Sequence, residues 1–369
     1  MAGRLARLSS GAKVCGTLRM AAPGNRVSRA EAPLLGRSEI NELTISLRLA
    51  DLRRMDGDER LQREFIQAKL GGIDQHRINV VVLRLRVAPG QKIENMDVEY
   101  IWDLLQAPGN DIVVPPVVNL PGGSGRLTRY QDFLKMFLVQ ASSAGSIVIG
   151  ATLPSFTHHS RVRDILSPQL AAGAEFILHD LGGRIALSNY PIITAVLRIL
   201  RENSMEDFFL YGYDPKPYKQ ATGTVAASDL TLWTMGFNSF GPRHTIARMP
   251  RNVIPKPPRG GVAAGWSRVL VQGDYGYHRL DQTAGKRAFE SWMSGQRDRS
   301  TPISSVVLKD EDLTKVWTRA YNRGVLGGIG SQFEKRIHAQ TLAKLLRTKQ
   351  HAPELLRLAL KANHALYQS

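Results

Sequence analysis

Continuous apolar runs, each closed by a polar residue, recur along the middle of the chain. They are rich in β-branched and aromatic residues and alternate with longer amphipathic segments. Runs that are apolar throughout, rather than at every second position, are typical of parallel strands covered on both faces. We predict strands over 79–87, 111–119, 146–152, 175–180, 207–214, 229–238 and 268–274, with an eighth over 43–49.

The segments between these runs carry helical periodicity. Leu134, Phe137, Leu138 and Ala141 stand at i, i+3, i+4 and i+7, which places them on one helix face. The alternation of strands and helices predicts an α/β fold, a (β/α)₈ TIM-barrel-like parallel barrel. An open, doubly wound sheet is the alternative, although no glycine-rich phosphate fingerprint follows the first of the seven main strands.

The predicted barrel occupies residues 41–300, between two basic segments. Residues 1–40 form an N-terminal arm, whose first 30 residues contain no acid. Residues 301–369 form a helical C-terminal appendage, and from Lys315 onwards it holds ten Lys or Arg against two acids. Such a tail either binds polyanions or presents a solvated helix face.

Charge is the most unusual total of this sequence. The 369 residues carry a net charge of +17, which creates a positive potential that attracts polyanions. We therefore expect a nucleic acid, DNA or RNA, as partner through the basic surface, unless the arginines only solvate that surface. No apolar run is long enough to cross a bilayer, so we expect no membrane partner.

Cysteine and histidine usage argues against a metal or another cofactor. Cys15 is the only cysteine, so an intramolecular disulfide and a cysteine-rich zinc site are excluded. His158 and His159 are adjacent, and adjacent side chains of an extended segment point to opposite sides. The single cysteine fits the reducing cytoplasm, or an organelle matrix if the basic N-terminus is a transit peptide.

Most of the predicted strands end in a side chain that ionises or hydrogen-bonds. In a parallel barrel the carboxyl ends of the strands converge on one mouth, where such enzymes hold their active sites. Asp180 and Asp214 close two strands that follow one another in the sequence. We predict that they are a catalytic pair acting as acid, base or nucleophile, in which mutual repulsion raises the pKa of one carboxyl.

Other polar residues at the strand ends and in the loops after them are predicted to bind substrate. Three of these loops place glycines beside an arginine, a combination that suits an anionic ligand. Ordinary turn chemistry is the alternative, because Asp, Asn and Gly favour turns. The predicted substrate-binding residues are Asn119, His179, Arg184, Asn238, Arg243, His244 and Asp274.

A basic barrel with two mouth aspartates resembles the tRNA-guanine transglycosylase superfamily, across about residues 79–280. The resemblance implies a nucleobase-exchanging glycosyltransferase, in which Asp180 and Asp214 supply the nucleophile on the sugar and the group that handles the base. The segment "FNSFGPRH" at 237–244 stands where that family has a polar loop with an arginine. The chain departs from the family in lacking the cysteine-rich zinc motif of bacterial members, and Asn238 is not a carboxylate.

Three functions follow from these features. The first is a barrel enzyme acting on a nucleic acid or a nucleotide-like anion, with base exchange of transglycosylase type as one reaction. The second is an enzyme of small phosphorylated metabolites. The third is a non-catalytic nucleic-acid-binding or assembly protein on a degenerate barrel, since the sequence leaves open whether the chain is an enzyme.

Overall fold

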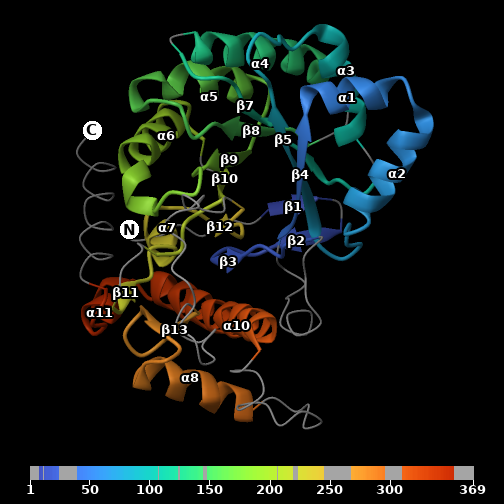
Figure 1. The fold of residues 1–369 in the computed structure, drawn as a ribbon. Coiled ribbons are helices and arrows are strands. Elements are labelled where there is room, and N and C mark those ends of the chain that lie inside the picture. Colours follow the sequence, from blue (N-terminus) through green and yellow to red (C-terminus); the bar gives the residue numbers. More distant parts are fainter. Residues whose placement is uncertain are drawn as a thin grey trace.

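Parallel strands surrounded by helices make up the upper part of the molecule (Figure 1). The computed structural model describes residues 8–10, 12–24, 40–106, 108–123, 125–143, 148–205, 207–218, 223–244, 267–295 and 310–352. The proline-rich stretch 249–261 and the last 17 residues of the chain lie outside these ranges.

One sheet has five strands, in the order β3-β12-β10-β9-β8, and every pair is parallel. The strands predicted over 175–180 and 207–214 are confirmed and are parallel neighbours, and residues 150–152 of the strand predicted over 146–152 also lie in this sheet. The strands of this sheet are β3 (Arg19–Met20), β8 (Gly150–Leu153), β9 (Phe176–Asp180), β10 (Phe209–Tyr213) and β12 (Ser239–Phe240).

The second parallel sheet confirms the strands predicted over 43–49 and 79–87. Nine residues of β4 pair with nine of β5 in an unbroken register. The run predicted over 111–119 is two strands, because Pro115 and Pro116 interrupt it and proline has no N–H for the ladder. The strands are β4 (Ile40–Arg48), β5 (Ile78–Arg86), β6 (Ile112–Val113) and β7 (Val117–Asn119).

Single parallel bridges join the two sheets at both edges. Ala22, just past β3, pairs with Asn41 of β4, and its backbone N–H donates to the Ile40 carbonyl at 2.7 Å. On the other side Val113 of β6 pairs with Ile149, immediately before β8. The prediction of an α/β fold built on parallel strands is therefore confirmed.

Each sheet buries two separate apolar faces. Val80, Val82, Phe176 and Leu178 alternate along their strands and belong to a core on one face. The opposite face packs against helices, where Phe137 of α4 is fully buried. The helices here are α1 (Leu49–Asp56), α2 (Glu59–Leu70), α3 (Asn95–Leu105), α4 (Arg126–Ser142), α5 (Val162–Ala171) and α6 (Tyr190–Glu202), with short turns η2 (His159–Arg161) and η3 (Ala186–Asn189).

An antiparallel sheet and further helices lie below the parallel sheets in Figure 1. The sheet has the order β11-β14-β13, and both of its pairs are antiparallel. The elements are β11 (Val225–Ala226), β13 (Arg268–Val271), β14 (Gly276–Arg279), α8 (Thr283–Ser294), α10 (Glu311–His338) and α11 (Leu342–Arg347), and a separate hairpin joins β1 (Leu8–Ser10) to β2 (Lys13–Cys15).

Two predicted parallel strands were wrong. Residues 268–274 include β13, but its partner is β14 in a hairpin, not a parallel neighbour. Residues 229–238 hold helix α7 (Leu230–Thr234), which Asp229 caps by accepting from the Leu230 N–H at 3.0 Å. Every residue of α7 is buried, so its sequence shows no exposed stripe that would distinguish a helix from a buried strand.

The helices of the described part differ from membrane-spanning helices in length or polarity. None of those in the described ranges is both long and apolar enough to cross a bilayer. The longest, α10, has 28 residues and carries charged side chains along its length.

Candidate active site

The two predicted catalytic aspartates lie together. Asp180 ends β9 and pairs in register with Tyr213 of β10, and Asp214 follows Tyr213 directly. Asp180 accepts from the Gly182 N–H at 2.9 Å and is 4% exposed. Asp214 is fully buried, and Arg84 lies 3.7 Å from its carboxylate. The parallel pairing of β9 and β10 therefore brings both carboxyls to one place.

The surroundings of Asp180 favour its protonated form. Burial raises the pKa of Asp180 above the ordinary carboxyl value, and the charge of Asp214 raises it further. Hydrogen bonds from Ser155 and Gly182 and the charge of Arg84 act in the opposite direction without cancelling the rise. Burial, rather than the predicted repulsion between the two carboxylates, is the largest cause of the raised pKa.

A buried polar cluster lies beside the pair, and sequence analysis missed most of it. Glu42 of β4 accepts from the Tyr211 hydroxyl at 2.5 Å and from the Thr44 hydroxyl at 3.1 Å. The Nε2 atom of His244 contacts the same carboxylate, and the His244 ring stacks on Tyr213 with centroids 5.1 Å apart. We call these five residues the Glu42 cluster. Burial raises the pKa of both tyrosines well above its ordinary value.

His244 connects the Glu42 cluster to the aspartate pair. Its backbone N–H donates to Asp214 Oδ1 at 2.6 Å, while its ring contacts Glu42. The ring atom Nδ1 is buried and has no hydrogen-bond partner among the described residues. Because buried polar atoms are almost always hydrogen-bonded, this nitrogen is a natural contact for a ligand.

Several predicted substrate-binding residues lie elsewhere. His179 precedes Asp180 in β9, so strand alternation sends its ring to the helix-covered face, 6.3 Å from the ring of Phe237. Asn238 stands before β12, not at its carboxyl end, and its side chain accepts from the Leu210 N–H at 2.7 Å. Asn238 therefore lies at the opposite end of the strands from Asp180.

The remaining predicted residues divide between the surface and a cavity. Asn119 ends β7 and is exposed, and Arg184 is exposed in the loop after β9. Asp274 lies in the turn between β13 and β14. Arg243 and His244 both line one cavity of about 440 Å³.

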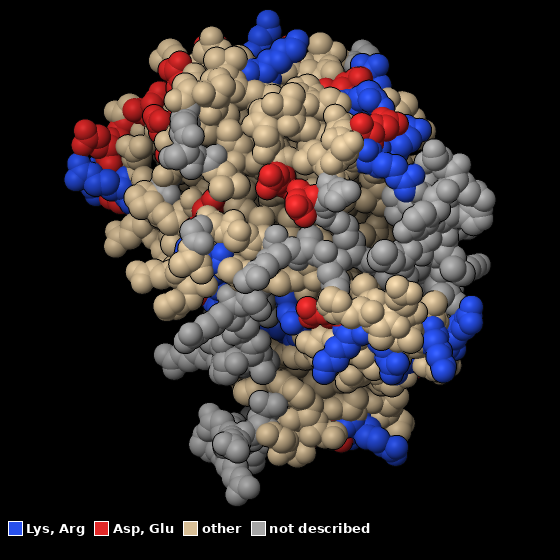
Figure 2. Space-filling view, turned by 180° about the vertical axis from the view of Figure 1, so that it is seen from behind, with Lys and Arg blue, Asp and Glu red and all other residues tan. Residues whose placement is uncertain are grey.

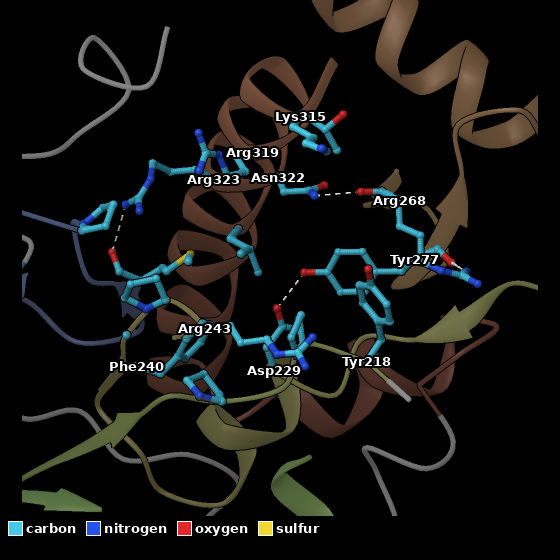
Figure 3. Close-up of a pocket in the computed structure, with 18 of the residues that line it drawn as sticks. Tyr218, Asp229, Phe240, Arg243, Arg268, Tyr277, Lys315, Arg319, Asn322 and Arg323 are labelled. Atoms are coloured by element: carbon cyan, nitrogen blue, oxygen red, sulfur yellow. Dashed lines mark hydrogen bonds between the residues drawn. The ribbon is translucent and has the colours of Figure 1, made fainter. Parts of the chain in front are cut away.

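Positive side chains surround this cavity. Figure 3 shows Lys315, Arg319 and Arg323 on α10 along one side, with Tyr218 and Tyr277 facing them. Buried Thr318, also from α10, presents a hydroxyl that has no hydrogen-bond partner in the described ranges. The cationic residues of the lining are Arg243, Arg268, Lys315, Arg319 and Arg323.

The one acid in the cavity lining, Asp229, is only partly ionised at neutral pH. Burial raises the pKa of Asp229 to about 7, although the Tyr277 hydroxyl donates to it at 2.6 Å. Arg268 is held over the Tyr218 ring, and the rings of Tyr218 and Tyr277 lie 4.9 Å apart. The cavity thus combines cations with aromatic faces.

Basic side chains also gather on the outer surface. Figure 2 shows Lys and Arg over the lower right of the rear face, where α11 and the adjoining end of α10 lie, whereas both signs mix over the upper helices. Lys335, Arg336, Lys344 and Arg347 on these two helices are exposed.

No protein-family model matches the sequence, and no curated protein resembles it significantly.

The buried position of His179 leads to a test of stability against pH. Burial lowers its pKa to about 4 from 6.5, so between these values the unfolded chain binds a proton that the folded chain does not. The free energy of unfolding is therefore expected to fall as the pH falls from 6.5 to 4, by roughly 3 kcal/mol from this residue. Urea unfolding of the wild type and of His179→Gln at several pH values measures the contribution.

The quantity to compare is the difference between the two proteins. Asp229, with its pKa raised to about 7, stabilises the folded state at low pH and loses that contribution as the pH rises, which opposes His179 over the same range. Both proteins contain Asp229, so its effect cancels. Parallel pH curves for wild type and His179→Gln would show that His179 titrates normally in the folded chain.

Proposed function

We propose that the chain is an enzyme that binds a nucleotide-like anion, free or within a nucleic acid, and acts on it by acid–base chemistry. One observation carries the proposal: His244 lines the basic cavity and also contacts two buried carboxylates, those of Glu42 and Asp214. A ligand in the cavity would lie against an imidazole that contacts Glu42, on a residue whose backbone N–H donates to Asp214.

We infer further that the parallel strands close into one barrel of eight positions. The order would be β3, β4, β5, β6 with β7, β8, β9, β10 and β12, returning to β3. The bridges at Ala22–Asn41 and Val113–Ile149 support it, because they join both edges of one sheet to the other. In such a ring Glu42, Arg84 and Asp180 occupy inward positions, since they continue the alternation of the inner core.

The chemistry of the cavity favours a nucleotide among anions. Arginines suit phosphate because they present a fork of donors, and the faces of Tyr218 and Tyr277 suit a base. The exposed cations Arg243, Lys315 and Arg319 stand where a longer chain of phosphates would pass. A small phosphorylated metabolite would use the cations but would make no contact with Tyr218 and Tyr277.

The aspartate pair supplies groups for base exchange, the reaction that the resemblance to the transglycosylases implies. In that reaction Asp214 attacks the anomeric carbon of the sugar, the bond from that carbon to the base breaks, and protonated Asp180 gives its proton to the leaving base. An incoming base then forms a bond to the anomeric carbon and displaces the Asp214 carboxylate, while its N–H proton passes to the Asp180 carboxylate. The raised pKa of Asp180 suits the proton donor, because it keeps a proton available closer to neutral pH.

Two arginines that the sequence equally suggests for phosphate binding give a matched test. Arg243→Gln is expected to weaken binding of guanosine monophosphate about tenfold or more, because Arg243 lines the cavity. Arg184→Gln is expected to leave the affinity unchanged, because Arg184 is exposed in the loop after β9 and is absent from the lining. Isothermal titration of each variant measures the affinity.

The same titrations separate the alternative functions. Equal affinity for inorganic phosphate and for the nucleotide would favour an enzyme of small phosphorylated metabolites. Tight, salt-dependent binding of an oligonucleotide that is unaffected by Arg243→Gln, with no turnover, would favour a non-catalytic protein that uses its basic surface. Equal losses in Arg184→Gln and Arg243→Gln would contradict the assignment of the cavity.

A further inference from the structure

Three metal-binding side chains meet at the hairpin of the lower sheet, away from the aspartate pair. Asp274 lies in the turn after β13, His278 lies in β14, and His351 follows α11. One ligand atom from each lies within 4.8 Å of the others. We propose that these three residues bind a zinc ion that fastens the segment after α11 to the hairpin.

The distances between the donor atoms suit a single small cation. Asp274 Oδ2 lies 2.7 Å from His278 Nε2 and 3.7 Å from His351 Nε2. Ligands that are each about 2.1 Å from a tetrahedral zinc ion stand about 3.4 Å apart, so shifts of roughly half an ångström produce the coordination geometry. Two imidazoles and a carboxylate form a donor set that zinc accepts and that magnesium and calcium do not favour.

Neighbouring groups hold the ligands in place. The Oγ1 atom of Thr224 lies 3.1 Å from His278 Nδ1, so that nitrogen can donate its proton to the hydroxyl while Nε2 faces the ion. The His351 N–H donates to the Asp274 carbonyl at 3.0 Å, which fixes the chain of one ligand to that of another. The Gly276 N–H donates to the other carboxylate oxygen of Asp274 at 2.9 Å.

Gly276 also leaves the space that the cluster occupies. A Cβ atom at this position would lie 2.6 Å from His351 Cδ2 and 3.2 Å from His278 Nε2. The side chains of Asp274 and His351 remain about one fifth exposed, at 20% and 22%. Both side chains are therefore accessible to an ion from solution.

Zinc titration of the full chain without a histidine tag tests the proposal. Competition with a chromogenic chelator is expected to show one high-affinity zinc ion per chain, and magnesium in excess is not expected to displace it. His351→Gln should weaken binding by at least about a hundredfold, and Thr224→Val, which alters only the support of His278, by about tenfold. His159→Gln is the matched control, because His159 is an exposed histidine of η2 outside the cluster, and it should bind zinc like the wild type.

Two further measurements test the zinc site in the wild type itself. Cobalt added to the wild type should give the intense visible absorption of a four-coordinate site, and zinc should raise the melting temperature of the wild type but not of His351→Gln. Circular dichroism confirms that the variant is folded. Wild type and His351→Gln binding zinc with equal affinity would overturn the proposal, as would equal losses in His351→Gln and His159→Gln.

Discussion

Asp180→Asn is expected to reduce turnover by a factor of about 10² to 10⁴ while the protein stays folded. The asparagine side chain keeps an oxygen that accepts from the Gly182 N–H, so the turn after β9 retains its hydrogen bond. The substitution removes the proton that the proposed acid transfers to the leaving base. Turnover is measured as incorporation of labelled guanine into RNA, alongside release of base from nucleotides.

Asp207→Asn is the matched control for this experiment. Asp207 is exposed just before β10, on the same chain segment as Asp214 but at the other end of the strand. It should keep both turnover and melting temperature at the wild-type values. If activity survives Asp180→Asn while the melting temperature falls, Asp180 stabilises the turn after β9 and is not the acid of the reaction.

Glu42→Ala is expected to lower the free energy of unfolding by about 3–5 kcal/mol. Glu42 is 1% exposed, and its carboxylate accepts from Tyr211 and Thr44 and contacts His244. Removing it leaves those polar groups buried without their acceptor, which costs more than the loss of the contacts themselves. Urea unfolding of both proteins at pH 7 measures the difference.

Glu59→Ala provides the comparison, because Glu59 pairs with Arg63 on the surface of α2, and both side chains are more than three-quarters exposed. Its loss should change stability by no more than about 0.5 kcal/mol. A similar small effect for Glu42→Ala would mean that water reaches the Glu42 cluster, and the cluster would then not be a desolvated part of the site.

The strands at the centre of the fold could be predicted because their burial leaves a continuous apolar signal. The runs that became β5, β9 and β10 each have this character. The same rule failed at α7, where burial on all sides gives a helix the composition of a buried strand. It also failed at β13, because an apolar run does not specify whether its partner is parallel or antiparallel.

Only the part of the candidate site that consists of residues at the ends of strands could be predicted from the sequence. Asp180 and Asp214 could be paired because they end consecutive strands. His179 was misplaced because its neighbour Asp180 already occupied the other face of the strand. Glu42 lies just outside the predicted strand, and an acid ahead of alternating apolar residues was the available signal.

The cavity and the cluster around Asp274 could not have been predicted. Arg319 lines the same cavity as Arg243, although it belongs to helix α10, which begins far along the chain. His351 lies beside His278, although 73 positions separate them in the sequence. These contacts depend on how helices and strands pack in three dimensions. The residue types of segments that lie far apart in the sequence do not reveal that packing.

Helix α10 packs against β3, and this contact can form only late in the synthesis of the chain. The Arg323 guanidinium donates to the Ala21 carbonyl at 3.0 Å, and a Cβ atom on Gly330 would lie 2.1 Å from the Leu18 carbonyl oxygen. Strand β3, at one end of the five-stranded sheet, is thus covered by α10 only after about 300 more residues have been synthesised. Until then the nascent chain exposes β3 and the apolar surface against which Ile329 and Phe333 of α10 later pack. Translation that stops before α10 is complete should therefore leave a product that chaperones retain.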